Sequence, residues 1–389
     1  MTSNESKART GTGGGQWQTA IQIPVVERSS GEITNSSSKL AQKEWVGFLI
    51  CPRCAATLTH EQNKLLCQGC SKEWPISDGI PAFVEGFPYW GEFPLDQMLE
   101  LTSLIQKEYW KRVLLDSQAP SVLKASGMIL NLERANWHRM ADLSPHSRVL
   151  DLGAGMGTIS HALAHRFREV IALEPVLERV EFMRRRFAQE GLANVKILRA
   201  SVWSIPFPPE SFDLVVLNSV LEWLPTGTDG DPELLQQEAL NKAFQLLRPG
   251  GYLYLGTDNR LSWDNFTGVT DARSGLPYVT ILPRPLAHWY AKRKGRTQGY
   301  RNYVYSFRGY RKLLKRAGFT RIEFYLAIPS QELPRFYLPL ENNVFSYYSA
   351  NFDPVRSGRL AKAAHWLLNR LGLLKYLQKS FAIFARKEL

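Results

Sequence analysis

Three glycines set two residues apart, Gly153, Gly155 and Gly157, follow a short apolar run and precede a helical pattern. Glycine has no Cβ and adopts positive φ, so such a turn lets the backbone approach a ligand closely. The helix that follows directs free N–H groups at the same place. The spacing differs from the dinucleotide fingerprint Gly-x-Gly-x-x-Gly, and Asp151 just before the turn would repel a pyrophosphate. The turn therefore favours a nucleoside ligand without phosphates.

All four cysteines of the chain fall in two Cys-x-x-Cys pairs, Cys51 with Cys54 and Cys67 with Cys70. Two such pairs can surround one tetrahedral Zn²⁺ with four thiolates. Disulfides or free thiols are the alternatives, but disulfides would be unusual in a chain that we expect to be cytosolic, and chance would seldom place four cysteines in two such pairs. Because four thiolates leave no open coordination position, the predicted Zn²⁺ is structural. The residues between the pairs, 55–66, indicate a short hairpin.

A second apolar run, 169–173, ends at an acid, Glu174. In a doubly wound sheet, ligands bind beyond the carboxyl ends of the strands. An acid at the tip of the second strand suits a ribose diol, although a carboxylate that only caps the next turn would give the same pattern. Given the glycines, we favour ribose binding at Glu174.

The run Asp151-Leu-Gly-Ala-Gly-Met-Gly resembles the first motif of class I S-adenosylmethionine-dependent methyltransferases, of the methyltransferase type 11 kind. Arg248-Pro-Gly-Gly-Tyr-Leu resembles the late motif of the small-molecule members, including the quinone-biosynthesis type. The resemblance covers residues 148–260. It implies an α/β fold with a Rossmann-like, doubly wound sheet of seven strands, and S-adenosyl-L-methionine as the cofactor. The cofactor residues that it implies are Asp151, Gly153, Gly155, Gly157, Glu174, Ser201, Val202 and Asn218.

Two of these positions carry a particular expectation. In the family pattern an acid after the third strand meets the adenine amino group, whereas this chain has Ser201, whose hydroxyl can still accept one hydrogen bond. Val202 is placed to flank the adenine ring. Asn218 ends the fourth strand, and in this superfamily that strand tip faces the methyl group and its acceptor.

The segment 48–84 carries a second resemblance, in Leu49-Ile-Cys-Pro-Arg-Cys, Leu66-Cys-Gln-Gly-Cys and Trp74-Pro-Ile-Ser-Asp-Gly-Ile-Pro. These runs are similar to the small zinc-ribbon domain related to the activator subunit of eukaryotic and archaeal methyltransferases. The resemblance implies docking or scaffolding by this segment rather than chemistry.

The pattern divides the chain into four parts with different compositions. The first is polar and poor in large apolar residues, so we expect it to be disordered. Two stretches of the last part are rich in aromatic residues and arginine, and we interpret them as insertions that form a substrate lid. The boundaries are 1–44 for the tail, 45–90 for the zinc ribbon, 91–145 for a helical linker or cap, and 146–389 for the methyltransferase domain, with insertions at 257–305 and 330–379.

The composition limits the function classes. The chain has 389 residues, 44% of them hydrophobic, which is enough to bury a full core. No apolar run approaches the ~20 residues of a membrane span, and no signal-peptide segment stands at the N-terminus, so we expect a cytoplasmic protein. The net charge of +12 favours a polyanionic neighbour, either nucleic acid or an anionic membrane, although a solvated basic face is the simpler explanation.

The leading hypothesis is methyl transfer to a sugar or lipid-linked small molecule of cell-envelope or secondary metabolism. A hydroxyl acceptor would need a general base. The candidates are Glu222 and Asp258, just past the fourth and fifth strands, and His288 on the first insertion. A basic amphipathic pattern over 356–375 predicts peripheral contact with the inner face of the membrane, with an ordinary packed helix as the alternative.

Two other hypotheses stay open. Ribosomal or transfer RNA is the second choice of acceptor, because the chain is basic and a zinc ribbon accompanies some RNA methyltransferases. Against it, Asn218-Ser-Val-Leu does not resemble the Asn-Pro-Pro-Tyr type of motif that methylates base amino groups. The third is a non-catalytic scaffold with the methyltransferase fold, which Ser201 favours and the intact glycines and Glu174 oppose.

Overall fold

The structure is a computed structural model that describes residues 47–351 and 359–388, with side chains in the second range from residue 362 onward. Residues 1–44, which we expect to be disordered, lie outside the described residues. Arg356 of the predicted basic helix also lies outside them.

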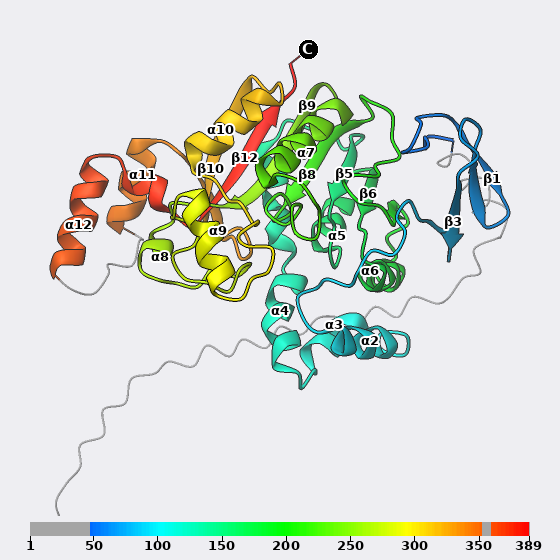
Figure 1. The fold of residues 1–389 in the computed structure, drawn as a ribbon, viewed down its shortest axis with the longest axis horizontal. Coiled ribbons are helices and arrows are strands. Elements are labelled where there is room, and N and C mark those ends of the chain that lie inside the picture. Colours follow the sequence, from blue (N-terminus) through cyan, green and yellow to red (C-terminus); the bar gives the residue numbers. More distant parts are fainter. Residues whose placement is uncertain (1–46, 352–358, 389) are drawn as a thin grey trace, which may run out of the picture. The chain divides into compact units, whose positions relative to one another are not determined.

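A mixed sheet of eight strands forms the centre of the described chain, in the order β11-β10-β12-β9-β8-β5-β6-β7 (Figure 1). Six strands run in one direction and two run against them, which confirms the predicted α/β class. The expected number of seven strands is wrong by one, because the second insertion adds β11 at the edge. The strands that share one direction are β5 (Arg148–Leu152), β6 (Glu169–Leu173), β7 (Val195–Leu198), β8 (Phe212–Asn218), β9 (Leu247–Asp258) and β10 (Arg321–Ile328); the two that run against them are β11 (Phe336–Pro339) and β12 (Ser380–Arg386).

Helices cover both faces of this sheet because its strands are apolar on both faces. Successive side chains of a strand point to opposite sides, so Val149 and Leu150 of β5 enter different clusters, and both are fully buried. Leu150 packs in the cluster that includes residues of α7 (Pro232–Leu246) and α10 (Phe307–Arg316). Val149 packs with α5 (Thr158–Ala164) and the 3₁₀ segment η1 (Leu132–Met140).

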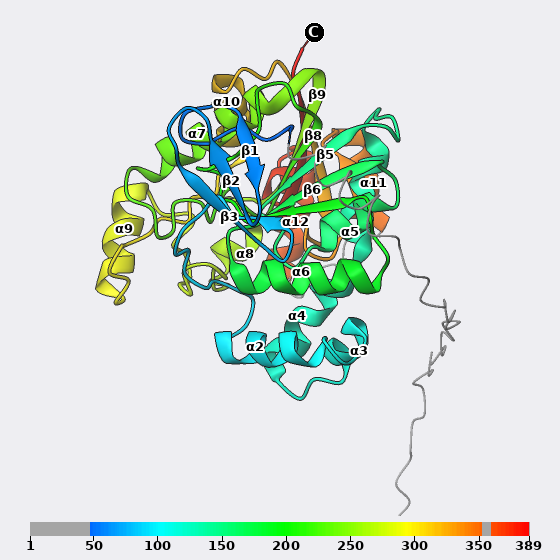
Figure 2. The same ribbon diagram turned by 90° about the vertical axis from the view of Figure 1, so that its right-hand side faces the viewer.

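The predicted helical region before the sheet is confirmed as α2 (Leu95–Leu104), α3 (Trp110–Leu115) and α4 (Pro120–Leu130). They pack around the buried Trp110 and against Phe182 of α6 (Leu177–Gln189), below the sheet in Figure 2. Met156, from the glycine turn, belongs to the same cluster. These helices therefore support the carboxyl ends of the strands, where the turn lies.

The cysteine segment forms a four-stranded antiparallel sheet of β1 (Leu58–Glu61), β2 (Lys64–Cys67), β3 (Glu73–Ser77) and β4 (Ile80–Pro81), and its first two strands are the expected hairpin. The chain after β4 then runs parallel to the edge of the central sheet next to β7. The Phe83 N–H donates to Arg199 O at 2.7 Å, and the Arg199 N–H donates to Pro81 O at 3.0 Å. Phe83 and Leu65 also join the hydrophobic cluster of the central sheet, so the two sheets share one core.

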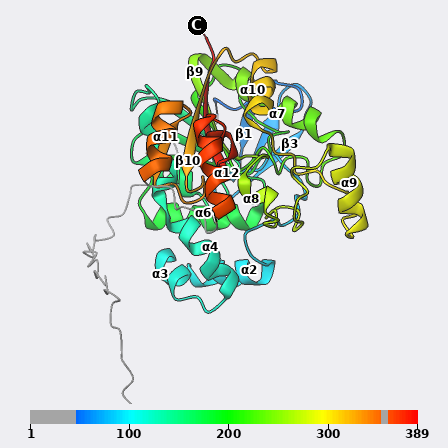
Figure 3. The same ribbon diagram turned by 90° about the vertical axis from the view of Figure 1, so that its left-hand side faces the viewer.

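Both insertions are present. The first carries α8 (Trp263–Phe266) and α9 (Arg284–Arg293); the second carries β11, α11 (Asn342–Asn351), α12 (Arg359–Arg370) and the short η2 (Leu374–Leu377), which Figure 3 shows from their own side. The apolar residues of the predicted basic helix differ in exposure: Leu367 and Leu371 are 50% and 61% exposed, whereas Leu368 packs against the core and Leu374 is buried in it. Trp366 of α12 is also exposed, at 59%. Among the described residues, none of the helices has the length and apolar character needed to cross a bilayer.

Candidate active site and candidate metal centre

The glycine turn joins β5 to α5, and all three glycines have positive φ, at 75°, 57° and 76°. A Cβ on Gly153 would stand 2.7 Å from Val220, and one on Gly157 would stand 2.6 Å from Phe187, so these two positions are closed by packing. A Cβ on Gly155 would meet only the guanidinium of Arg179, at 3.9 Å. The middle glycine therefore faces the space that a ligand at this turn would occupy.

Glu174 lies at the tip of β6 and is 2% exposed. One carboxylate oxygen accepts the Gly155 N–H at 2.9 Å, and the other accepts the Val176 N–H at 3.1 Å. Burial raises the pKa of Glu174, while Arg179 and the two N–H groups oppose the shift. The carboxylate thus caps the following turn and also ties it to the glycine turn, which places it beside the space at Gly155.

Asp151 is buried in β5, and its Oδ2 accepts the Ser160 hydroxyl at 2.6 Å. Burial raises the pKa of Asp151 to about 6, against the opposing effect of the Ser160 bonds. The carboxylate therefore fixes the first turn of α5 to the strand. Its expected contact with the cofactor stays a prediction.

Arg186, the last of three consecutive arginines on α6, lies inside the protein. Its side chain is fully buried, and its Nη1 donates to Met156 O at 2.9 Å and to Thr158 Oγ1 at 3.2 Å. The guanidinium carbon lies 4.0 Å from the centre of the Trp110 ring. Arg186 therefore holds the far side of the glycine turn, a role that a run of three arginines does not reveal.

The segment between the ribbon and α2 reaches the same strand ends. Trp90 stacks near Trp223 with ring centres 4.5 Å apart, and the Arg179 guanidinium lies 4.5 Å from the Trp90 ring. Arg179 also pairs with Glu92 at 2.8 Å and approaches Glu174 at 3.9 Å. These contacts join the tips of β6 and β8. They are made by residues for which the sequence predicted no role, such as Trp90 and Glu92.

Ser201 and Val202 follow β7 in a tight loop, and both are buried. The Ser201 hydroxyl accepts the Trp203 N–H at 3.2 Å and lies 3.2 Å from the Ser204 hydroxyl. The side chain is thus engaged within its own loop, and its contact with adenine stays a prediction.

A group of buried polar side chains lies beyond the carboxyl ends of β8 and β9, and we call it the β8–β9 polar cluster. The Arg273 guanidinium, from the first insertion, binds Glu222 at 3.1 Å and also binds Asp258 and Asp271. Gln331, from the second insertion, donates to Asp258 at 3.3 Å. The members of the cluster are Asn218, Ser219, Glu222, Asp258, Arg273 and Gln331.

Two of the three base candidates meet in this cluster, but their surroundings differ. Burial would raise the pKa of Asp258, yet Arg273 and Ser380 outweigh it and hold the pKa below its usual value. Burial raises the pKa of Glu222, which Arg273 only partly offsets, and Glu222 Oε2 has no hydrogen-bond partner. Glu222 is therefore the better placed to take a proton. The third candidate, His288, lies on α9 with its ring against Gly299.

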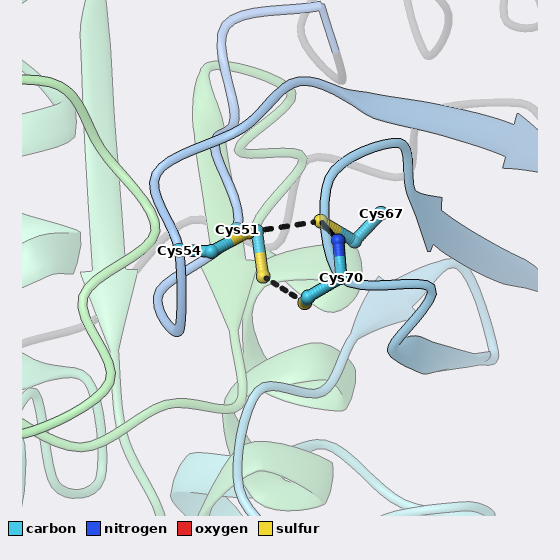
Figure 4. A group of neighbouring side chains, drawn as sticks. All are labelled: Cys51, Cys54, Cys67 and Cys70. Atoms are coloured by element: carbon cyan, nitrogen blue, oxygen red, sulfur yellow. Dashed lines mark hydrogen bonds between the residues drawn. The ribbon is translucent and has the colours of Figure 1, made fainter.

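The four cysteines converge as predicted, with all Sγ atoms within 4.8 Å of one another (Figure 4). Sγ separations are 3.8 Å for Cys51 and Cys70 and 3.3 Å for Cys54 and Cys67. A tetrahedral Zn²⁺ with Zn–S bonds of about 2.3 Å requires separations of about 3.8 Å. The N–H groups of Gly69 and Cys70 point at Cys67 Sγ, each at 3.4 Å, as suits a thiolate. The donor set therefore fits a structural zinc ion.

Residues 143–277 match the model of a family described as a methyltransferase domain. This part of the chain is therefore similar to a methyltransferase domain. Over 143 residues it is 32% identical to an uncharacterized methyltransferase of Mycobacterium tuberculosis, covering 36% of this chain and 53% of that protein. Over 139 residues it is 31% identical to a ubiquinone biosynthesis O-methyltransferase of Xylella fastidiosa, covering 36% of this chain and 51% of that one. The chain thus spans about half the length of these curated relatives.

Among solved structures, the YcgJ protein of Bacillus subtilis is similar, with a TM-score of 0.39 and 16% sequence identity. The likeness covers 67% of this chain and 100% of that one.

We predict that Cys67→Ser releases zinc and makes the segment 47–84 sensitive to protease while the central sheet persists. Binding free energy in such a site is folding free energy, so losing the ion unfolds its surroundings. Metal analysis of protein purified without chelators and limited proteolysis measure both effects, with Ser71→Ala as a control outside the ligand set. A parent protein without zinc would contradict the assignment.

We also predict that Asp151 makes stability depend on pH. An unfolded aspartate has a pKa of about 3.9, so between about pH 4 and 6 the folded chain binds this proton more tightly and stability falls as pH rises. The amide that replaces the carboxylate in Asp151→Asn can still accept the Ser160 hydroxyl but does not titrate, so the variant does not lose stability in this way. As pH rises from about 4 to 6, the free energy of unfolding of the variant should therefore increase relative to that of the parent by up to about 3 kcal/mol, and the difference should stay constant above about pH 6. Urea titrations at several pH values measure this, and a difference that does not change from pH 4 to 8 would disprove it.

Proposed function

We propose that this chain is an S-adenosylmethionine-dependent methyltransferase whose cofactor lies at the glycine turn. The observation that carries the proposal is the open space at Gly155 beside the buried carboxylate of Glu174, on a domain that matches methyltransferases. When bound, the cofactor supplies an electrophilic methyl group on a sulfonium sulfur.

The residues at this site fit such a ligand. Each Glu174 oxygen accepts one backbone N–H and keeps capacity for a second bond, which suits the two hydroxyls of a ribose. Arg179 approaches that carboxylate and Trp90 lies against Arg179, so both are placed to shield the nucleoside from water. The other proposed cofactor residues are Asp151, Gly153, Gly157, Ser201, Val202 and Asn218.

For a hydroxyl acceptor, we assign the proton transfer to Glu222. The acceptor oxygen forms a bond to the methyl carbon, the carbon–sulfur bond breaks with its electron pair left on sulfur, and the hydroxyl proton passes to Glu222 Oε2. That oxygen is buried without a partner, and the raised pKa strengthens the carboxylate as a base. Asp258 instead holds Arg273 in place, and we assign no step to His288.

We propose a sugar or lipid-linked small molecule as the acceptor, with peripheral contact between the protein and the cytoplasmic face of the membrane. Each insertion carries an exposed tryptophan with an arginine one helical turn later. The guanidinium carbon of Arg293 lies 5.9 Å from the centre of the Trp289 ring, and that of Arg370 lies 5.3 Å from the centre of the Trp366 ring. Exposed tryptophan beside a cation is typical of a surface that contacts anionic lipid headgroups.

RNA is a second candidate, and one observation favours it. A surface hollow of about 620 Å³ on α10 is lined by Phe307 and by five cations: Arg308, Arg311, Lys312, Lys315 and Arg316. Such a basic face suits phosphate contacts. A non-catalytic scaffold is the third possibility, and the unpartnered Glu222 oxygen speaks against it, because burying an unused carboxylate oxygen costs stability.

For the ribbon, we propose a structural zinc ion and a scaffolding role. The ribbon continues the edge of the central sheet and leads directly into the segment that contacts Arg179. Its position therefore couples the folded state of the metal site to the cover of the cofactor site.

We predict that Glu174→Gln and Gly155→Asn each weaken binding of S-adenosylhomocysteine at least tenfold. The first removes a charged acceptor for the ribose; the second fills the open space, and asparagine tolerates the positive φ, so backbone strain stays small. Calorimetry measures the affinity, with the exposed Glu238→Gln as the matched control. Unchanged affinity in both variants would refute the proposed cofactor site.

We predict that labelled methyl groups from S-adenosylmethionine enter the lipid or sugar fraction of a cell extract, and that Glu222→Gln reduces the label at least a hundredfold. The protein should also sediment with vesicles containing anionic lipid, and Trp366→Glu should reduce this. Label in RNA alone, lost steeply with added salt, would establish the second candidate instead. Label in no fraction, with intact donor and bound cofactor, would establish the scaffold.

A further inference from the structure

The β8–β9 polar cluster contains buried polar atoms that no protein group satisfies. Both amide atoms of Asn218, the Oε1 of Gln331 and the Oε2 of Glu222 lack hydrogen-bond partners. These three residues are 9%, 2% and 1% exposed. The Ser219 hydroxyl and the Arg273 Nε are also unsatisfied. Leaving such groups unpaired costs stability, so their accumulation in one place indicates a missing ligand.

Two of the unsatisfied oxygens lie beside the same residue, Gly256. A Cβ on Gly256, in β9, would stand 2.2 Å from Asn218 Oδ1 and 3.0 Å from Gln331 Oε1. Gln331 is oriented by its own donation to Asp258, which fixes its oxygen towards Gly256. Because Gly256 has no Cβ, these two carbonyl oxygens can lie against its backbone, and both still require a donor.

The donor or acceptor character of the unsatisfied atoms indicates which chemical groups the ligand must carry. Three of them only accept hydrogen bonds, two only donate, and the serine hydroxyl does both. A phosphate or carboxylate has no donor for the three oxygens, and it would face Glu222, Asp258 and Asp271 with only Arg273 between them. An ammonium group has no acceptor for Asn218 Nδ2 or Arg273 Nε. Neighbouring hydroxyls of a sugar ring both donate and accept.

We infer that the cluster binds an uncharged polyhydroxyl group, the vicinal hydroxyls of a sugar ring, through Asn218, Gln331 and Glu222. This inference rests on the proposed function in that it names the acceptor of the same site. It narrows that acceptor to a ring that carries no charge next to the reacting hydroxyl.

The inference is tested by binding rather than by turnover. Protein saturated with S-adenosylhomocysteine is titrated with methyl glycosides of the common hexoses and pentoses, and with the matching amino sugars, uronic acids and sugar phosphates, using ligand-observed NMR. We expect the neutral glycosides to include the tightest ligand, and Gln331→Met to weaken that ligand at least tenfold while S-adenosylhomocysteine affinity is unchanged. The exposed Asn241→Leu is the control and should leave glycoside binding unchanged.

A second measurement separates a binding role from a structural one. Because the Asn218 side chain has no partner, Asn218→Leu should raise the unfolding temperature of the ligand-free protein. It should also abolish glycoside binding at an S-adenosylhomocysteine concentration shown to saturate the variant. The inference is overturned if no neutral glycoside binds, if a charged analogue binds more tightly, or if Asn218→Leu lowers the unfolding temperature. If S-adenosylhomocysteine itself fails to bind, the proposed function fails instead.

Discussion

The ion pairs of Arg273 hold together the acceptor side of the molecule. One guanidinium, 8% exposed, meets carboxylates from three places: Glu222 after β8, Asp258 at the end of β9, and Asp271 in the first insertion. Burying three carboxylates without this cation would cost several kcal/mol for each unpaired charge. The pairing therefore fixes the first insertion to the strand ends. It also leaves Glu222 with one oxygen bound and one free, the state in which it can take a proton.

The parts of the fold that local patterns encode were predicted from the sequence. The glycine turn, the apolar runs of the parallel strands and the two Cys-x-x-Cys pairs each depend on residues close together in the chain, and the structure places all of them as expected. The position of Glu174 also followed, because a parallel sheet brings the tips of neighbouring strands to one edge. The same carboxylate caps the turn after β6 through the Val176 N–H and binds the glycine turn through the Gly155 N–H.

The missed residues act across long separations in the chain or on unexpected helix faces. Arg273 and Gln331 lie in insertions whose sequence carries no family motif, and only the folded chain brings them to Asp258. Arg186 was missed because a run of three arginines on a helix usually marks a solvated face. Its burial under Trp110 depends on α3 packing against α6, which no periodicity within either helix reveals. The eighth strand, β11, was missed because it is short and lies within an insertion.

The parallel pairing of residues 81–83 with Arg199 has a consequence for synthesis of the chain. The segment 47–84 is made before the central sheet, so its outer edge has no partner until Arg199, just after β7, has been made. During that interval the N–H and C=O groups around Phe83 form an open edge, able to pair with other strands. The completed protein closes this edge with its own later residues, so the last step in seating the ribbon depends on the sheet next to it.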